Sequence, residues 1–321
     1  MLPWILLLFG LALIVFGGDY FVRAAVGLAE LWKLPRVVIG ATLMSLATTS
    51  PEVVVSIMSG IEGESGLALG NAAGSVLCNI GLIAGLTAIL RRVTAHPAVL
   101  IGPLGALLAA AFLALFFALD RTISRTESAI LLAVGLIYFG WDFARNLHAP
   151  TRAEKKEAAE IVEEEVPAAR SLGSCLGLFA LGAAMVLVGS RLLVSNAVVI
   201  ATGFGISPVV IGLTIVAIGT SLPELVTAIT SARQNVSDLS IGNIIGANVA
   251  NLTLVVGSAG IISPIALARQ DLTLNFPALF LFISIFGFAL LVRKTLGKPV
   301  GLTLLTLYGL YLLIIVGQAV L

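Results

Sequence analysis

The chain has few charged residues for its length. Of its 321 residues only 11% are Asp, Glu, Lys or Arg, whereas 59% are hydrophobic, and the mean hydropathy is +1.11. Soluble globular domains carry about 25% charged residues. The composition therefore excludes a soluble domain and indicates a polytopic membrane protein. With a net charge of +1 and no basic patch, nothing in the sequence favours nucleic-acid binding.

Cysteine, histidine and targeting features are equally sparse. Cys78 and Cys175 both fall inside long apolar segments, which argues against a disulfide framework. No segment offers a cluster of His and Cys ligands for a soft metal. The first apolar segment lacks a preceding basic region and a small-residue cleavage site, so we expect it to be retained as a membrane span.

Long apolar runs dominate what remains. A segment of about 20 apolar residues crosses the hydrocarbon core as a helix. Unbroken runs without period-two alternation exclude a β-barrel. The sequence predicts an all-α polytopic membrane protein with ten transmembrane helices, at roughly 3–31, 36–60, 67–90, 97–119, 127–147, 172–201, 207–232, 239–262, 271–292 and 299–319.

The distribution of lysine and arginine predicts the orientation. If both termini lie outside, most of the 18 basic residues fall in cytoplasmic loops, and only Arg121, Arg125 and Arg269 fall in outside loops. Because cytoplasmic loops carry the excess of basic residues, we expect a multi-pass protein of the cell membrane (inner or plasma membrane) with both termini extracytoplasmic.

One short motif occurs twice, 172 residues apart. Thr48-Thr49-Ser50-Pro51-Glu52 matches Thr220-Ser221-Leu222-Pro223-Glu224, and matching identities surround both copies without a gap. Each half contains five expected spans, an odd number, so the second half must insert upside down. The sequence thus predicts two inverted five-helix repeats, at 1–147 (motif 40–85) and 171–321 (motif 212–257), joined by a cytoplasmic linker at 148–170.

Each motif places a carboxylate near the middle of a span. Charged residues at that depth are costly and usually functional, so Glu52 and Glu224 are candidate cation ligands. Ser45, Thr48 and Thr49 lie on the helix face of Glu52, and Ala217, Thr220 and Ser221 lie on that of Glu224. Each proline also frees a backbone carbonyl.

The third and eighth spans add side-chain amides to these two centres. Asn71, Ser75 and Asn79 recur along one, and Asn243 and Asn251 along the other. We interpret Gly70, Gly74, Gly242 and Gly246 as close-packing positions between helices. For Asn71 and Asn243 cation binding and interhelical bonding are equal alternatives. Carboxylate, hydroxyl, amide and carbonyl oxygens suit hard cations such as Ca²⁺ and Na⁺.

The motifs Gly-Thr-Ser-Leu-Pro-Glu (219–224) and Gly-Asn-x-x-Gly-Ala-Asn-x-x-Asn (242–251) resemble the repeats of the Na⁺/Ca²⁺ exchanger family, in its compact prokaryotic form. The resemblance covers nearly the whole chain. It implies a diamond of cation sites between spans two, three, seven and eight, with long first and sixth spans as sliding gate helices. The implied metal ligands are Ser45, Thr48, Thr49, Glu52, Ser75, Asn79, Ala217, Thr220, Ser221, Glu224 and Asn251.

The sequence departs from the family pattern at a few positions. Ala247 stands where the second repeat usually has serine, and the first repeat reads Ala47-Thr48-Thr49-Ser50-Pro51 instead of Gly-Thr-Ser-Leu-Pro. Both changes bear on Na⁺ coupling. Asn251 is neutral where K⁺-dependent relatives carry Asp, which argues against K⁺ co-transport.

The expected function is a secondary antiporter that exchanges Ca²⁺ for Na⁺ by alternating access at a midplane site. Ca²⁺/H⁺ exchange is the alternative, and an intramembrane hydrolase using the two carboxylates or a passive cation channel are weaker ones. The expected partners are Ca²⁺, Na⁺, H⁺ in the alternative, and the lipid bilayer, with no obligate protein partner. The chain is expected to be a transporter and not an enzyme, with no cofactor besides the transported ions.

Overall fold

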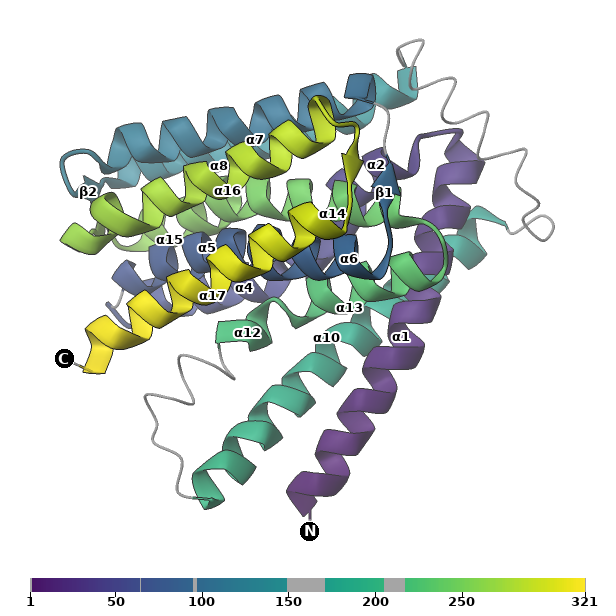
Figure 1. Cartoon of the computed structure of the whole chain (residues 1–321), viewed down its shortest axis with the longest axis horizontal. Coiled ribbons are helices and arrows are strands. Elements are labelled where there is room, and N and C mark those ends of the chain that lie inside the picture. The colour runs from purple at the N-terminus through teal and green to yellow at the C-terminus, as the bar shows by residue number, and fades with distance from the viewer. Residues whose placement is uncertain (1, 64, 95–96, 149–170, 205–216, 321) are drawn as a thin grey trace.

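The computed structural model describes residues 2–63, 65–94, 97–148, 171–204 and 217–320, which are almost entirely helical (Figure 1). In this part of the chain, eight helical segments are long and apolar enough to cross a membrane, and they coincide with eight of the expected spans. They are Leu2–Trp32 (α1), Ser65–Leu90 (α5, η2 and α6), Pro97–Ala118 (α7), Arg125–His148 (α8), Leu172–Gly203 (α10), Ser237–Ile262 (α14, η4 and α15), Asp271–Leu291 (η5 and α16) and Lys298–Val320 (α17).

A ninth apolar segment is broken in the middle. Residues Arg36–Thr48 and Ser50–Ile61 form a helix pair bent by 41°, which coincides with the expected span 36–60. It consists of α2 (Arg36–Ile39), the π-helical turn η1 (Gly40–Met44), α3 (Ser45–Thr48) and α4 (Ser50–Ile61).

The expected span 207–232 is described only in its second part. There α12 (Ala217–Thr220) is followed by α13 (Leu222–Arg233), with a break at Ser221. Residues 207–216 lie outside the described residues, and so does the expected linker apart from His148, which ends α8.

The span that contains α14 (Ser237–Ala250), η4 (Asn251–Val255) and α15 (Val256–Ile262) is the most deeply buried of the eight. Gly242 and Gly246 let it approach the first broken span, because a Cβ at either position would overlap the backbone carbonyl of Val37 or Ala41. The predicted close-packing role of these two glycines is confirmed.

For the matching glycines of the first repeat the packing role stays a prediction. No described residue comes within 4 Å of a Cβ built at Gly70 or Gly74. The segment that the repeat would place against them, residues 209–213, lies outside the described residues.

The two longest helices, α1 and α10, pack against each other more extensively than any other described pair. Figure 1 shows them side by side, set at an angle to the other long helices. Glycines form the contact: a Cβ at Gly10 would lie 2.8 Å from the carbonyl oxygen of Gly189, and the reverse distance is the same. Gly17 and Gly182 make a similar crossing. The interface therefore depends on close backbone approach.

Two very short antiparallel strand pairs connect loops that are far apart in sequence. β1 (Val93–Thr94) pairs with β4 (Thr295–Leu296), with Val93 opposite Leu296. β2 (Thr122–Ile123) pairs with β3 (Ile265–Ala266), with Ile123 opposite Ile265. Each pair joins a loop of the first half to a loop of the second half. We call them the β1–β4 latch and the β2–β3 latch.

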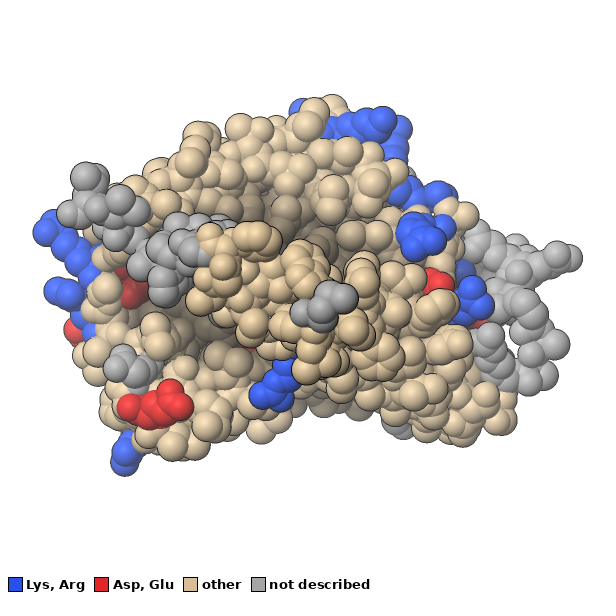
Figure 2. Space-filling view, turned by 90° about the horizontal axis from the view of Figure 1, so that it is seen from below, with Lys and Arg blue, Asp and Glu red and all other residues tan. Residues whose placement is uncertain are grey.

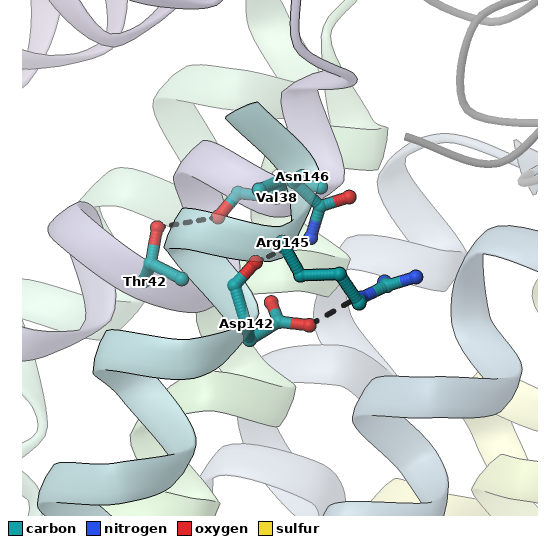
Figure 3. Close-up of polar contacts among 5 residues, drawn as sticks. All are labelled: Val38, Thr42, Asp142, Arg145 and Asn146. Carbon is teal, nitrogen blue, oxygen red and sulfur yellow. Dashed lines mark hydrogen bonds and ion pairs between the residues drawn. The ribbon is translucent and has the colours of Figure 1, made fainter. Parts of the chain in front are cut away.

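A small polar cluster lies where the end of α8 meets the first broken span (Figure 3). Asn146 donates to the carbonyl of Asp142 at 2.8 Å, and Arg145 lies 3.6 Å from the Asp142 carboxylate. On the neighbouring element, Thr42 donates to the carbonyl of Val38 at 2.7 Å. Each of these contacts runs within one helical segment, and the buried Oδ1 of Asn146 has no hydrogen-bond donor among the described residues.

Candidate cation site

Two helix breaks create the centre of the site. Pro51 and Pro223 each stand in the first turn of a new helix, α4 and α13, because proline lacks the N–H that an unbroken helix would need. Thr49 and Ser221, just before these helices, have ψ angles of −2° and 11°. Ser50 donates to the freed carbonyl of Ala47 at 2.7 Å. The predicted break at each proline is confirmed, and at the first break the Ser50 hydroxyl takes the freed carbonyl.

Each break places a glutamate in the first turn of the helix that follows. There the positive end of the helix dipole favours a negative charge. Glu52 and Glu224 are fully buried, and Thr49, three residues before Glu52, donates a hydrogen bond to Glu224. Asp142 is the third buried carboxylate among the described residues. The structure therefore brings the two helix breaks, with their buried glutamates, together across the two halves.

Hydroxyl groups of the first motif reach across to the second half. Thr49 donates to Oε1 of Glu224 at 3.3 Å, and Thr48 donates to Oδ1 of Asn243 at 3.2 Å. In the opposite direction, the hydroxyls of Ser221 and Ser75 lie 3.5 Å apart. The structure therefore brings together five candidate residues of the expected set around the two breaks: Thr48, Thr49, Ser75, Ser221 and Glu224, with Glu52 beside them.

Asn79 and Asn251, the two asparagines of the expected ligand set, each lie at the start of a distorted helical turn. Asn79 starts the π-helical turn η2 (Asn79–Ala84), and Asn251 starts η4. Such turns are rare and occur often at functional sites, since they expose backbone and re-aim side chains. Both asparagines are fully buried, and Asn79 donates to Oδ1 of Asn248 at 3.0 Å. The duplicated sequence thus repeats a backbone distortion as well as a residue.

Several buried oxygens in this region have no hydrogen-bond donor among the described residues. They are Oε1 and Oε2 of Glu52, Oε2 of Glu224, Oδ1 of Asn79 and Oδ1 of Asn251. Burying an unpartnered polar atom costs free energy, and an unpaired carboxylate costs more. Hard cations bind such oxygens. The arrangement can therefore hold a dehydrated Ca²⁺ or Na⁺ ion.

Three of the expected ligands are placed less directly. The Ser45 hydroxyl donates within its own helix, to the carbonyls of Ala41 and Thr42, while its carbonyl accepts from Thr49 N–H at 2.9 Å. Thr220 is half-buried and lines a hollow of about 450 Å³ between the two helix breaks and α10, together with Pro51 and Pro223. Ala217 begins α12, where only its backbone is described.

Asn248 was missed by sequence reasoning. It is fully buried, accepts from Asn79, and its own Nδ2 has no partner among the described residues. Its repeat counterpart is Val76, so the comparison of halves gave no signal there. The signal lay in the second motif alone, because Asn248 and Asn251 are three residues apart and share a helix face.

Asn71 and Asn243, for which the sequence allowed either cation binding or interhelical bonding, form hydrogen bonds between helices. Asn71 donates to Ser56 at 3.1 Å and to the carbonyl of Glu52 at 3.4 Å. Asn243 donates to Thr227 at 3.0 Å while accepting from Thr48. The interhelical alternative therefore describes both. No group of three or more His, Cys, Asp or Glu side chains gathers among the described residues.

The fold and the site together define a helical membrane protein with paired broken helices around a buried polar centre, an arrangement typical of secondary transporters. The profile of the family described as "Sodium/calcium exchanger protein" matches residues 2–143 and 174–317. This chain belongs to that family.

Named relatives agree with this assignment. The chain is similar to the inner membrane protein YrbG of Escherichia coli, with 38% identity over 81% of this chain and 79% of the relative. It is 28% identical to the sodium/calcium exchanger MaX1 of Methanosarcina acetivorans over 97% of this chain and 98% of the relative. The solved sodium-calcium exchanger NCX_Mj superposes with a TM-score of 0.82 at 29% identity, covering 96% of this chain and 97% of that one.

These similarities establish the broad activity and setting. Family membership supports exchange of Ca²⁺ against another cation, the relatives are transporters, and a membrane location follows from both the relatives and the apolar helices. The expected family resemblance is confirmed.

Proposed function

We propose that this protein is a secondary antiporter that exchanges Ca²⁺ for Na⁺ by alternating access. The observation that carries the proposal is the set of donor-free oxygens on Glu52, Glu224, Asn79 and Asn251, all buried where the two broken spans meet. Two carboxylates balance one Ca²⁺, or two monovalent ions. Because the same oxygens serve either load, the two ions exclude each other, and that exclusion is the basis of exchange.

The proposal includes the inverted architecture. Ten spans form two antiparallel five-helix repeats at 1–147 and 171–321, with the linker 148–170 and the loops carrying most of the basic residues on the cytoplasmic side. Both termini then lie outside. The repeated break–proline–glutamate pattern and the repeated π-helical turns at Asn79 and Asn251 support this arrangement.

The ligands of the proposed site are those of the two motifs and the two π-helical turns. Asn248 joins them as a neighbour that holds Asn79. The long helices α1 and α10, which pack on each other through close glycine contacts, supply the gate, as the family resemblance implies for the first and sixth spans. The ions are cargo, and no resident cofactor is needed. The proposed ligand set is Ser45 (by its carbonyl), Thr48, Thr49, Glu52, Ser75, Asn79, Ala217 (by its carbonyl), Thr220, Ser221, Glu224 and Asn251.

Ion gradients imposed one at a time on proteoliposomes test the coupling. Ca²⁺ uptake should require a Na⁺ gradient directed opposite to the Ca²⁺ movement, and a K⁺ gradient alone should not drive it. Conductance that needs no counter-ion would instead identify a channel and contradict the proposal.

Ca²⁺/H⁺ exchange is the second candidate, and Ala247 favours it. This fully buried residue offers no hydroxyl where the family pattern has serine, so one oxygen ligand for Na⁺ is absent. Carboxylates carry protons without that hydroxyl. Uptake driven by a pH gradient in Na⁺-free buffer, with none driven by Na⁺, would establish this candidate in place of the first.

A further inference from the structure

A second polar feature lies at one end of the molecule, outside the cation site. A hollow of about 400 Å³ opens where the β1–β4 latch joins the end of α6 (Gly85–Leu90) to the start of α17. Its lining includes Arg91, Arg92, Arg293 and Lys298. Figure 2 shows that Lys and Arg side chains gather mainly toward opposite ends of the molecule, with largely uncharged surface between them.

Within the part of the chain that the structure describes, no carboxylate neutralises these cations. No acidic residue lines the hollow, and none of the four basic side chains forms an ion pair or a hydrogen bond to a carbonyl among the described residues. Arg293 instead lies over the ring of Phe288, 6.0 Å from its centre. Like charges held together repel one another, so an anion in this hollow would relieve that repulsion.

The β2–β3 latch at the related position shows a different use of arginine. There Arg121 donates to the carbonyl of Leu267 at 3.4 Å, and Arg125 donates to that of Ile262 at 3.0 Å. Acidic residues stand in the same loops, namely Asp120, Glu127 and Asp271, each accepting a backbone N–H. The two latches share a strand pairing but not a charge balance, so latch geometry does not explain the basic hollow.

Two further features give the hollow the character of a headgroup site. The helix α17 begins at Lys298, and its first N–H groups point out of the helix end, which favours an anion there. Apolar side chains that face outward border the basic residues: Leu90 lines the hollow and is 55% exposed, and Phe288 and Val292 precede Arg293 with 54% and 63% exposed. Cations above an apolar rim match a phosphate above acyl chains.

We propose that this hollow binds the phosphate headgroup of an anionic membrane lipid, with Arg91, Arg92, Arg293 and Lys298 holding the phosphate oxygens. The lipid chains lie against Leu90, Phe288 and Val292. The bound lipid bridges the loop after α6 and the loop before α17, and so reinforces the β1–β4 latch. This assignment does not depend on which ions the protein exchanges.

Lipid binding to the purified full chain in detergent tests the proposal, with native mass spectrometry or a lipid-dependent shift in Tm as the readout. Phosphatidylglycerol should bind more tightly than zwitterionic phosphatidylcholine. The variant R91Q/R293Q/K298Q should bind phosphatidylglycerol about 100-fold more weakly, since each cation near the membrane surface contributes roughly fivefold. The matched variant R121Q/R125Q/R269Q, at the other latch, should bind it as the unmodified chain does.

The single exposed substitution K298Q guards against misfolding and should weaken binding about fivefold. Inorganic phosphate separates the two sources of the anion: millimolar phosphate should not displace the lipid. Equal binding of both lipids, unchanged binding in R91Q/R293Q/K298Q, or displacement by inorganic phosphate would each overturn the assignment.

Discussion

The two halves of the cation site share a repeated motif but form different hydrogen bonds. In one half Glu224 accepts from Thr49, whereas Glu52 in the other has no donor on either oxygen among the described residues. The residue that repeats Thr49 is Ser221, and its hydroxyl meets Ser75 instead of Glu52. The duplicated motif therefore produces one carboxylate with a hydroxyl donor and one without any donor among the described residues.

The difference follows from which helix each hydroxyl faces. The first broken span packs closely on α14 through Gly242 and Gly246, which brings Thr48 to Asn243. In the first repeat Asn71 turns to Ser56 and to the carbonyl of Glu52. The two repeated asparagines therefore have different hydrogen-bond partners in the two halves.

The largest expected effect comes from neutralising the carboxylates. Glu52→Gln should reduce Ca²⁺ transport at least about 100-fold, because a lost charge partner in a buried site costs about 3 kcal/mol. Glu224→Gln should reduce Ca²⁺ transport by a similar factor. Ca²⁺ uptake into proteoliposomes measures both. Glu62→Gln, at the exposed end of α4, is the matched control and should transport normally. Transport that persists in the doubly neutral variant would contradict the role of these residues.

Acid should weaken Ca²⁺ binding, and the slope of the Kd against pH should give the number of protons that compete with the ion. A protonated carboxylic acid cannot coordinate the ion, so the Kd for Ca²⁺ should rise by up to about tenfold per pH unit for each proton bound. Equilibrium binding of Ca²⁺ at a series of pH values gives this slope. Glu224→Gln should lower the slope by removing one titrating group, and an isotherm that does not move with pH would refute the competition.

Removing one hydroxyl from each half sharpens the comparison. Thr49→Val should weaken Ca²⁺ binding about 10- to 100-fold, since a hydrogen bond to a charged group contributes about 1.5–3 kcal/mol. Ser221→Ala should have a smaller effect, because its hydroxyl lies 3.5 Å from another hydroxyl and not beside a carboxylate. Calorimetric titration of Ca²⁺ into the two variants measures the loss of affinity in each. Equal losses would show that the asymmetry does not persist when an ion is bound.

The smallest expected effect comes from restoring the missing hydroxyl. Ala247→Ser should lower the Na⁺ concentration for half-maximal exchange by about two- to fivefold, the value of one net hydrogen bond. Its repeat partner Ser75 provides the comparison, and Ser75→Ala should shift Na⁺ dependence the other way. Na⁺ titration of Ca²⁺ efflux measures both shifts. Higher Na⁺ requirements in Ala247→Ser would indicate that the buried side chain cannot be enlarged there.

Much of this arrangement could be predicted from the sequence because it follows from simple physical costs. The length of the apolar runs predicted the spans, the prolines predicted the helix breaks, and the presence of acids within the spans indicated Glu52 and Glu224. The π-helical turns at Asn79 and Asn251 could not be predicted, since π-turns have no side-chain signature comparable to proline. Asn248 escaped because its repeat partner is valine. Which hydroxyl reaches which carboxylate also depends on helix approach, which pattern alone does not define.

The two latches restrict where the molecule can bend. The β1–β4 latch joins the α6–α7 loop to the α16–α17 loop, and the β2–β3 latch joins the α7–α8 loop to the loop after α15. The helices α7 and α16 are therefore tied to the other half at both of their ends. Neither α1 nor α10 begins or ends at a strand. In the proposed exchange cycle, the helices joined by the latches would stay together as a frame, and the glycine-lined α1–α10 pair would be the part that moves against it.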